Sequence, residues 1–365
     1  MAEGVSSRRE RKSDAARLLL AAARERFAVA ATDLLLPEQA RLTEWQRLTA
    51  AGFLSRLVRS IEDDLRVRLA PRFEAHEALH AALSSAHVPI ALPILERAQA
   101  LRDAELTTIL VRRVEEHRFW KAKGPGESEE FLFELVRDAD DLVAAEAMEL
   151  VIARSRRFDR FQEPCMARVE LPAEIQHRLV WIVAAALRQY IVQQHNVGAV
   201  DGPVEETAAE IIAGYDEGES FEALSLRLCQ RLRRDERLDG AALARIIGDG
   251  MLPLFIAALG VLCGVDQAAT WEVLSDPRGR GPALLLRAAG VTREDAAAIL
   301  YALNARGPLF SGVEGDAAAD QLELYDTVDQ PSAREVLRLW QAHPAYRASV
   351  ARLSTRARSA ATGAA

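Results

Sequence analysis

The strongest chemical signal in this chain is the pentapeptide HEALH at residues 76–80. On a helix, His76 and His80 stand four residues apart and therefore share one face, where both imidazoles can hold Zn²⁺. Glu77 would then act as the general base on a metal-bound water. This pattern is typical of a zinc-dependent hydrolase.

Two features of the sequence weaken this interpretation. A zinc hydrolase needs a third protein ligand, and the nearest downstream acids, Glu96 and Asp103, do not stand at a spacing typical of such enzymes. These proteases also set the motif beside a substrate-gripping strand, and the chain shows no strand pattern. We therefore favour an ordinary helix at 74–85 and keep the zinc hydrolase as an alternative.

Other reactive residue types lack catalytic neighbours. His177 stands near Trp181 on an apolar helical face, and Cys165 follows a proline with no histidine pattern around it. The glycine-containing segments GPGES and DPRGRGP (276–282) lack the GK[ST] ending of a phosphate loop. The sequence thus predicts no catalytic residue, no metal site and no cofactor.

Composition favours an all-α protein. Half of the 365 residues are hydrophobic, Ala and Leu dominate, and period-2 runs of β-branched residues are nearly absent. The net charge is −8, with +4 in residues 1–72, +4 in residues 345–365 and therefore −16 in between. An acidic body repels phosphate backbones, which argues against a nucleic-acid surface.

The cysteines and the hydropathy pattern indicate a cytoplasmic protein. Three distant cysteines without a CxxC pair suit free thiols in a reducing compartment. No signal peptide is expected, because Arg24, Glu25 and Arg26 interrupt the first apolar stretch. The longest apolar run, at 252–263, suits a buried helix and is too short to cross a bilayer.

Helical periodicity and turn residues divide the chain into successive parts. We expect a disordered basic arm at 1–12 and an N-terminal helical segment at 13–70. Two helical-repeat blocks follow at 71–195 and 207–344, separated by a linker, and a basic flexible tail covers 345–365. Residues 311–332 carry six acids and no base, which predicts a solvated loop.

Four ungapped windows suggest an internal repeat: 94–110, 231–247, 258–274 and 284–300. In each, a capping residue precedes the second helix; these residues are Asp103, Asp239, Asp266 and Thr292. A short helix pair cannot bury its apolar face alone, so stacking of neighbours is expected. The predicted fold is an α-solenoid of HEAT-like helix pairs.

The segment HVPIALPILERAQALRDAELTTIL (87–110) resembles the repeat signature of the bacterial domain-of-unknown-function 2336 family. The matching residues are Ile90, Ala91, Pro93, Ile94, Leu95, Leu101, Asp103, Leu106 and Leu110. Residues 170–190 are also similar to members of that family, and the resemblance extends over about 40–350. It implies an α-helical repeat protein of unsettled function and transfers no active site.

Together these features predict a non-enzymatic scaffold or regulatory adaptor that binds a protein partner. Self-association through the leucine-rich stretch 42–70 is a second expectation. A third hypothesis is an adaptor that docks on an anionic surface through the basic termini, although a membrane partner is not favoured because charged termini are usually only solvated.

Overall fold

The computed structural model describes residues 42–85, 88–122, 130–161, 163–276, 279–306, 317–343, 345–347, 349–350 and 353. The chain divides into two compact units, residues 1–47 and 48–365, and the features below belong to the second. The predicted arm at 1–12 and most of the predicted tail at 345–365 lie outside the described residues.

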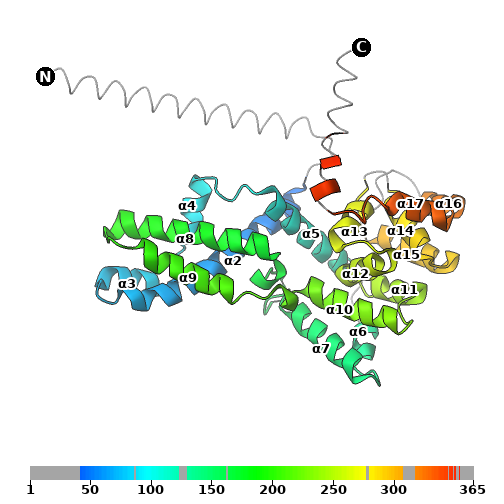
Figure 1. Ribbon diagram of the computed structural model, residues 1–365, viewed down its shortest axis with the longest axis horizontal. Helices are drawn as coiled ribbons and strands as arrows, with labels where there is room; N and C mark the ends of the chain where they lie inside the picture. Colours follow the sequence, from blue (N-terminus) through cyan, green and yellow to red (C-terminus); the bar gives the residue numbers. More distant parts are fainter. Residues whose placement is uncertain are drawn as a thin grey trace, which may run out of the picture. The chain divides into compact units, whose positions relative to one another are not determined.

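The described residues contain helices and turns and no β-strand, which confirms the all-α class (Figure 1). In chain order the elements are α2 (Glu44–Leu69), η2 (Ala70–Phe73), α3 (Glu77–Ser84), α4 (Ala91–Arg97), α5 (Ala104–Lys121), α6 (Glu130–Leu135), α7 (Asp141–Ser155), η3 (Arg168–Glu170), α8 (Ala173–His195), α9 (Asp201–Ala213), η4 (Glu217–Glu219), α10 (Phe221–Arg234), α11 (Gly240–Gly248), α12 (Leu252–Cys263), α13 (Gln267–Leu274), α14 (Gly281–Ala289), α15 (Arg293–Ala305), α16 (Ala317–Thr327) and α17 (Gln330–Leu337).

Each of the four predicted repeat windows is a helix, a tight turn and a second helix. The predicted caps are confirmed: the side chains of Asp103, Asp239, Asp266 and Thr292 accept backbone N–H groups of the helices that follow them. Each turn also contains one residue with positive φ, namely Gln99, Glu236, Gly264 or Gly290. A left-handed residue ends the first helix, and the cap then starts the second.

One hydrophobic cluster joins α2, α3, α4, α8, α9 and the first half of α5. The apolar face of α2 supplies Phe53, Leu57, Ile61 and Leu65, all fully buried. Most of the apolar face that suggested self-association through 42–70 is therefore used inside the chain, and that self-association stays a prediction.

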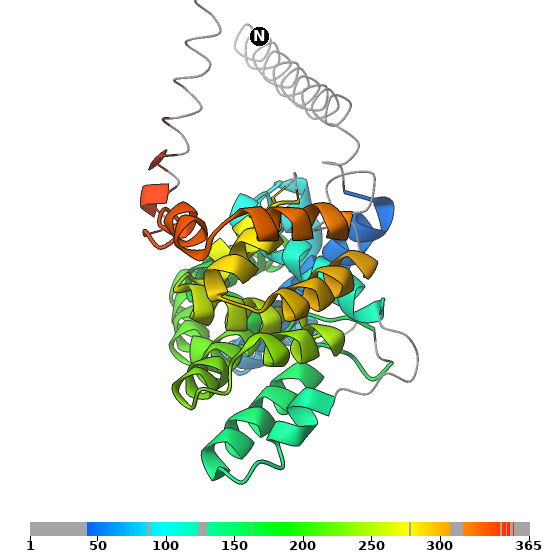
Figure 2. The same ribbon diagram turned by 90° about the vertical axis from the view of Figure 1, so that its right-hand side faces the viewer.

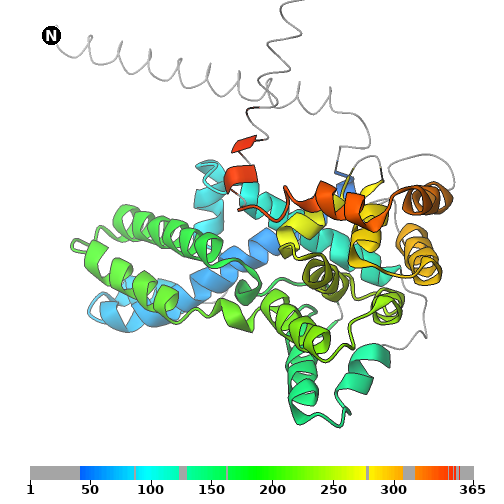
Figure 3. The same cartoon turned by 45° about the vertical axis from the view of Figure 1, so that its right-hand side comes forward.

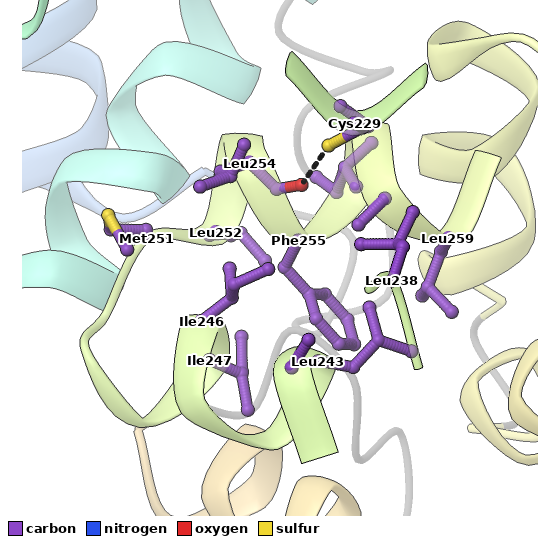
Figure 4. Close-up of a cluster of buried hydrophobic side chains, with 14 of the residues drawn as sticks. Cys229, Leu238, Leu243, Ile246, Ile247, Met251, Leu252, Leu254, Phe255 and Leu259 are labelled. Atoms are coloured by element: carbon purple, nitrogen blue, oxygen red, sulfur yellow. Dashed lines mark hydrogen bonds between the residues drawn. The ribbon is translucent and has the colours of Figure 1, made fainter. Parts of the chain in front are cut away.

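A second cluster surrounds α12, which is buried along most of its length. Figure 4 shows the ring of Phe255 among the side chains of Leu238, Leu243 and Ile247, with Cys229 directed at the carbonyl of Leu254. Among the described helices, none alone is long and apolar enough to cross a membrane; α12 and α13 pass that test only together, with a bend of 103° between them.

Helices of this second cluster pack in a row. α7 packs against α10, α10 against α12, α12 against α14, and α14 against both α16 and α17, while α11 packs against α15 (Figures 2 and 3). α6 and α7 form a hairpin at one edge of the row.

One prediction about an individual segment needs correction. The acid-rich stretch 311–332 is not only a loop, because residues 317–327 form α16. In this helix Asp320, Glu323 and Asp326 are exposed. Gln321 and Tyr325 are buried, and Tyr325 donates a hydrogen bond to the carbonyl of Val291. At the start of the predicted tail, Arg347 is 8% exposed and donates to the carbonyl of Trp340 at 2.9 Å.

Candidate functional site

A groove of about 740 Å³ lies between α4 and α8. One wall comes from α4 and the segment that leads into it, the other from α8, and α2 and α3 contribute to the base. The lining residues are Arg66, Ala82, Ser85, Val88, Pro89, Ile90, Pro93, Ile94, Arg97, Ala98, Gln189, Tyr190, Gln193 and Gln194.

An ion pair of α2 fixes the base of the groove. Glu62 and Arg66 are one helical turn apart, 1% and 3% exposed, and joined by a bond of 3.0 Å. The two carboxylate oxygens of Glu62 accept the backbone N–H groups of Ile90 and Ala91, both at 2.9 Å. No residue at the start of α4 caps it through its own side chain, so Glu62 supplies that cap from a neighbouring helix.

The guanidinium of Arg66 holds the other side of the same loop. Its nitrogens donate to the carbonyls of Ala82, Leu83 and Val88 at 2.7 to 3.0 Å. These bonds tie the end of α3 to the chain entering α4. Arg66 is therefore used to shape the groove and has little donor capacity left for a ligand.

The two walls of the groove differ in chemistry. The α4 side is mainly apolar, with Pro93, Ile94 and the 63% exposed Val88. The α8 side presents Gln189 and Gln193, which lie one turn apart and are both exposed. Primary amides both donate and accept hydrogen bonds, so this wall matches the N–H and C=O groups of a polypeptide.

The lining of the groove is poor in the side chains that usually carry acid–base or nucleophilic chemistry. Of the described residues that line it, none is a carboxylate, a histidine or a cysteine. General acid–base and nucleophilic catalysis usually rely on such groups. The charged lining residues are the arginines 66 and 97.

The HEALH motif lies at the start of α3. The helix begins at Glu77, and His76 is its N-cap, with φ −112° and ψ 79°; its carbonyl accepts the N–H of His80 at 2.9 Å. The Nδ1 atom of His80 lies 2.9 Å from the carbonyl oxygen of Ala70. Asp103, considered as a third ligand, caps α5. Within the described ranges, no group of three His, Cys, Asp or Glu side chains is arranged to hold a metal.

The other residues considered from the sequence have packing partners. His177 stacks edge-on against Tyr215, with ring centroids 6.1 Å apart. The thiol of Cys165 donates to the carbonyl of Arg156 at 3.1 Å, and burial raises its pKa. A raised pKa reduces the thiolate fraction and hence the nucleophilicity of this cysteine.

A buried charge cluster was not predicted from the sequence. Arg157 donates to Glu170 at 2.9 and 2.5 Å and to Glu116 at 2.8 Å, and its guanidinium lies 4.2 Å from the ring centre of Phe221. Arg113 joins the cluster through Glu116 at 3.4 Å.

Opposing influences act on the two arginines of this cluster. Burial alone would lower the pKa of Arg157, but the carboxylates of Glu170 and Glu116 outweigh burial and raise it. For Arg113 burial prevails and, with the positive charge of Arg157, lowers the pKa to about 10. The cluster lies where α5 passes from one hydrophobic cluster to the other.

A signal for this cluster was present in α5. Leu106 and Leu110 begin an apolar stripe at helical spacing, and Arg113 and His117 continue it at the same spacing. Charged residues on an apolar stripe indicate buried ion pairs or a site. Their partners, Arg157 and Glu170, lie in or beside connecting segments more than 40 residues away, where no periodicity marks them.

Residues 126–338 match the model of a family described as an uncharacterised protein conserved in bacteria (DUF2336). No curated protein and no solved structure matches the chain. The matched residues include 170–190 and the α8 wall of the groove, whereas 87–110 and the α4 wall precede them.

Proposed function

The chain belongs to the DUF2336 family of uncharacterised bacterial proteins, and from this premise we propose that it is a non-enzymatic helical scaffold that binds a partner polypeptide in the groove between α4 and α8. The carrying observation is the groove itself, with an apolar wall, an amide wall and a base fixed by the buried Glu62–Arg66 pair. A fixed base reduces the ordering cost of binding.

The lining chemistry narrows the proposed occupant. An extended segment would place alternate side chains on Pro93 and Ile94 while its backbone meets Gln189 and Gln193. Arginine charge without a lining carboxylate favours a segment that carries acidic residues, which would meet Arg97 at the rim.

The row of α7, α10, α12, α14 and α17 supports a HEAT-like repeat arrangement for the second cluster. Each helix in the row packs against the next, as expected when short helix pairs bury their apolar faces by stacking. Such a row would give the groove a stiff support.

Selection from a displayed library of random peptides tests the proposal. We expect selected peptides to share apolar residues at alternate positions and at least one acid. Their affinity, measured by fluorescence anisotropy, should fall more than about tenfold in Ile94→Glu and in Gln193→Trp. The new glutamate repels an acidic peptide, and the new tryptophan fills the groove.

Glu205→Trp on α9 is the matched control, since Glu205 is exposed and does not line the groove. It should bind the selected peptides as well as the unchanged protein does. Selected peptides that bind both groove variants with unchanged affinity would refute the groove as the binding site.

A further inference from the structure

The outer face of α7 is an apolar stripe at the surface. Met148 and Ile152 are 44% and 49% exposed, and Leu142 at the start of the helix is 59% exposed. The opposite face, with Val143, Ala147, Leu150 and Ala153, is buried in the second cluster. α6 and α10 pack on α7. Figures 2 and 3 show no described helix against the outer side of α7.

The spacing of this stripe is that of a coiled-coil seam. Asp141, Ala145, Met148, Ile152 and Ser155 follow one another at intervals of four, three, four and three residues. This period of 3.5 residues is the repeat with which two helices pack side by side over several turns. The apolar members lie in the middle and the polar members at the ends.

The charges at the two ends of the stripe are opposite. Asp141 lies at the N-terminal end of α7, and Arg156 follows its last residue; both are exposed, and neither has an ion-pair partner in the described part of the chain. A second α7 laid antiparallel would bring each acid to the other copy's arginine.

The same register also matches side-chain sizes. With a twofold axis between Met148 and Glu149, positions whose numbers sum to 297 face each other, so Asp141 faces Arg156 and Ala145 faces Ile152 of the other copy. A small residue opposite a large one lets the two helices interlock, and the two methionines lie on either side of the axis, each opposite Glu149 of the other copy. We infer that two copies of this chain associate through antiparallel α7 helices.

This interface is modest, because α7 has 15 residues and is about 22 Å long. Phe133 on α6, which is 49% exposed, lies at a hollow shared with Val151 and Ser155 of α7 and can extend the contact. An interface of this size should give a dimer that dissociates on dilution. The inference does not depend on the groove.

Sedimentation equilibrium of the full chain from about 1 to 200 µM, a range suited to weak interfaces, tests the inference. We expect a reversible monomer–dimer equilibrium. Ile152→Arg should weaken dimerisation more than about tenfold, since it places two like charges in the seam. Tyr301→Arg is the matched control, because Tyr301 is 71% exposed on α15, away from this seam, and should leave the equilibrium unchanged.

Charge exchange tests the antiparallel register. Asp141→Arg and Arg156→Asp should each weaken dimerisation about fivefold, because each creates two like-charge contacts per dimer. The double variant restores opposite charges and should recover the original equilibrium. A monomer throughout, a dimer unchanged by Ile152→Arg, or a double variant no better than the single ones would overturn the inference.

Discussion

Replacing Arg157 by methionine is the sharpest test of how the two hydrophobic clusters are joined. Methionine keeps much of the length and apolar surface of the side chain but removes its charge and its donors. Glu170 would lose the bonds at 2.9 and 2.5 Å, and Glu116 would lose the one at 2.8 Å. Both carboxylates are at least 92% buried and would remain without their main counter-ion.

The expected loss follows from that burial. Removing one partner of a buried, hydrogen-bonded ion pair costs about 3–5 kcal/mol, because the remaining charge keeps its desolvation penalty. The nearest remaining cation, Arg113, lies 3.4 Å from Glu116 and compensates only part of this. The free energy of unfolding should therefore fall by about 3–5 kcal/mol at pH 7.

Urea unfolding followed by circular dichroism measures this loss. The control is Arg245→Met, since Arg245 also pairs with a glutamate at 2.5 Å and lies over a phenylalanine ring, but is about half exposed. It should cost less than about 1 kcal/mol. Adding Glu170→Gln to the Arg157→Met variant should recover part of the loss, because the buried charge on Glu170 is then removed while Glu116 stays paired with Arg113 at 3.4 Å.

A loss of stability in Arg157→Met no larger than that in Arg245→Met would refute this account of the cluster.

Three further outcomes follow from the packing. Gly281→Ala should cost about 3 kcal/mol or more, because a Cβ atom there would lie 1.7 Å from the carbonyl oxygen of Val273, whereas Gly248→Ala has open space and should be neutral or stabilising in thermal melts. Burial, with the charges of Arg113 and Lys121, lowers the pKa of His117 to about 4, below its unfolded value of 6.5. Neutral His117 therefore contributes stability above pH 6.5, and at most about 3 kcal/mol of it is lost as the pH falls towards 4. In urea unfolding at a series of pH values, His117→Phe should make the free energy of unfolding depend less on pH over this range. In thiol labelling, Cys165 should react in the native protein and Cys229 only after unfolding, because burial raises the pKa of Cys229 and leaves it 0% exposed.

Local features of the fold could be predicted from the sequence. The cap at Asp266 is one example: its side chain accepts the N–H of Ala269, three residues away, so the information lies in one short segment. The helix at 317–327 was missed because its buried face consists largely of Gln321 and Tyr325, which do not form an apolar stripe. The solenoid arrangement stays a prediction, since it concerns contacts between distant segments.

The candidate groove was beyond sequence reasoning for a related physical cause. The base of the groove depends on Glu62, which caps a helix that starts 28 residues further along the chain. From its near neighbours in the sequence alone, a glutamate in a helix is expected on a solvated face. In the HEALH motif the letters fit the zinc-hydrolase alternative, but the helix starts at Glu77 and His76 is its N-cap. Motif spacing predicts chemistry only when the helix boundary is also known.

The segment between α7 and α8 links the two surfaces proposed here. Arg157 follows α7, which carries the dimerisation stripe, and Glu170 precedes α8, which forms the amide wall of the groove. Their ion pair therefore anchors the end of one helix to the start of the other. In Arg157→Met, hydrogen–deuterium exchange should increase both in the last turn of α7 and in the first turn of α8, whereas Arg245→Met should change neither. Faster exchange in only one of the two helices would mean that the cluster does not couple them.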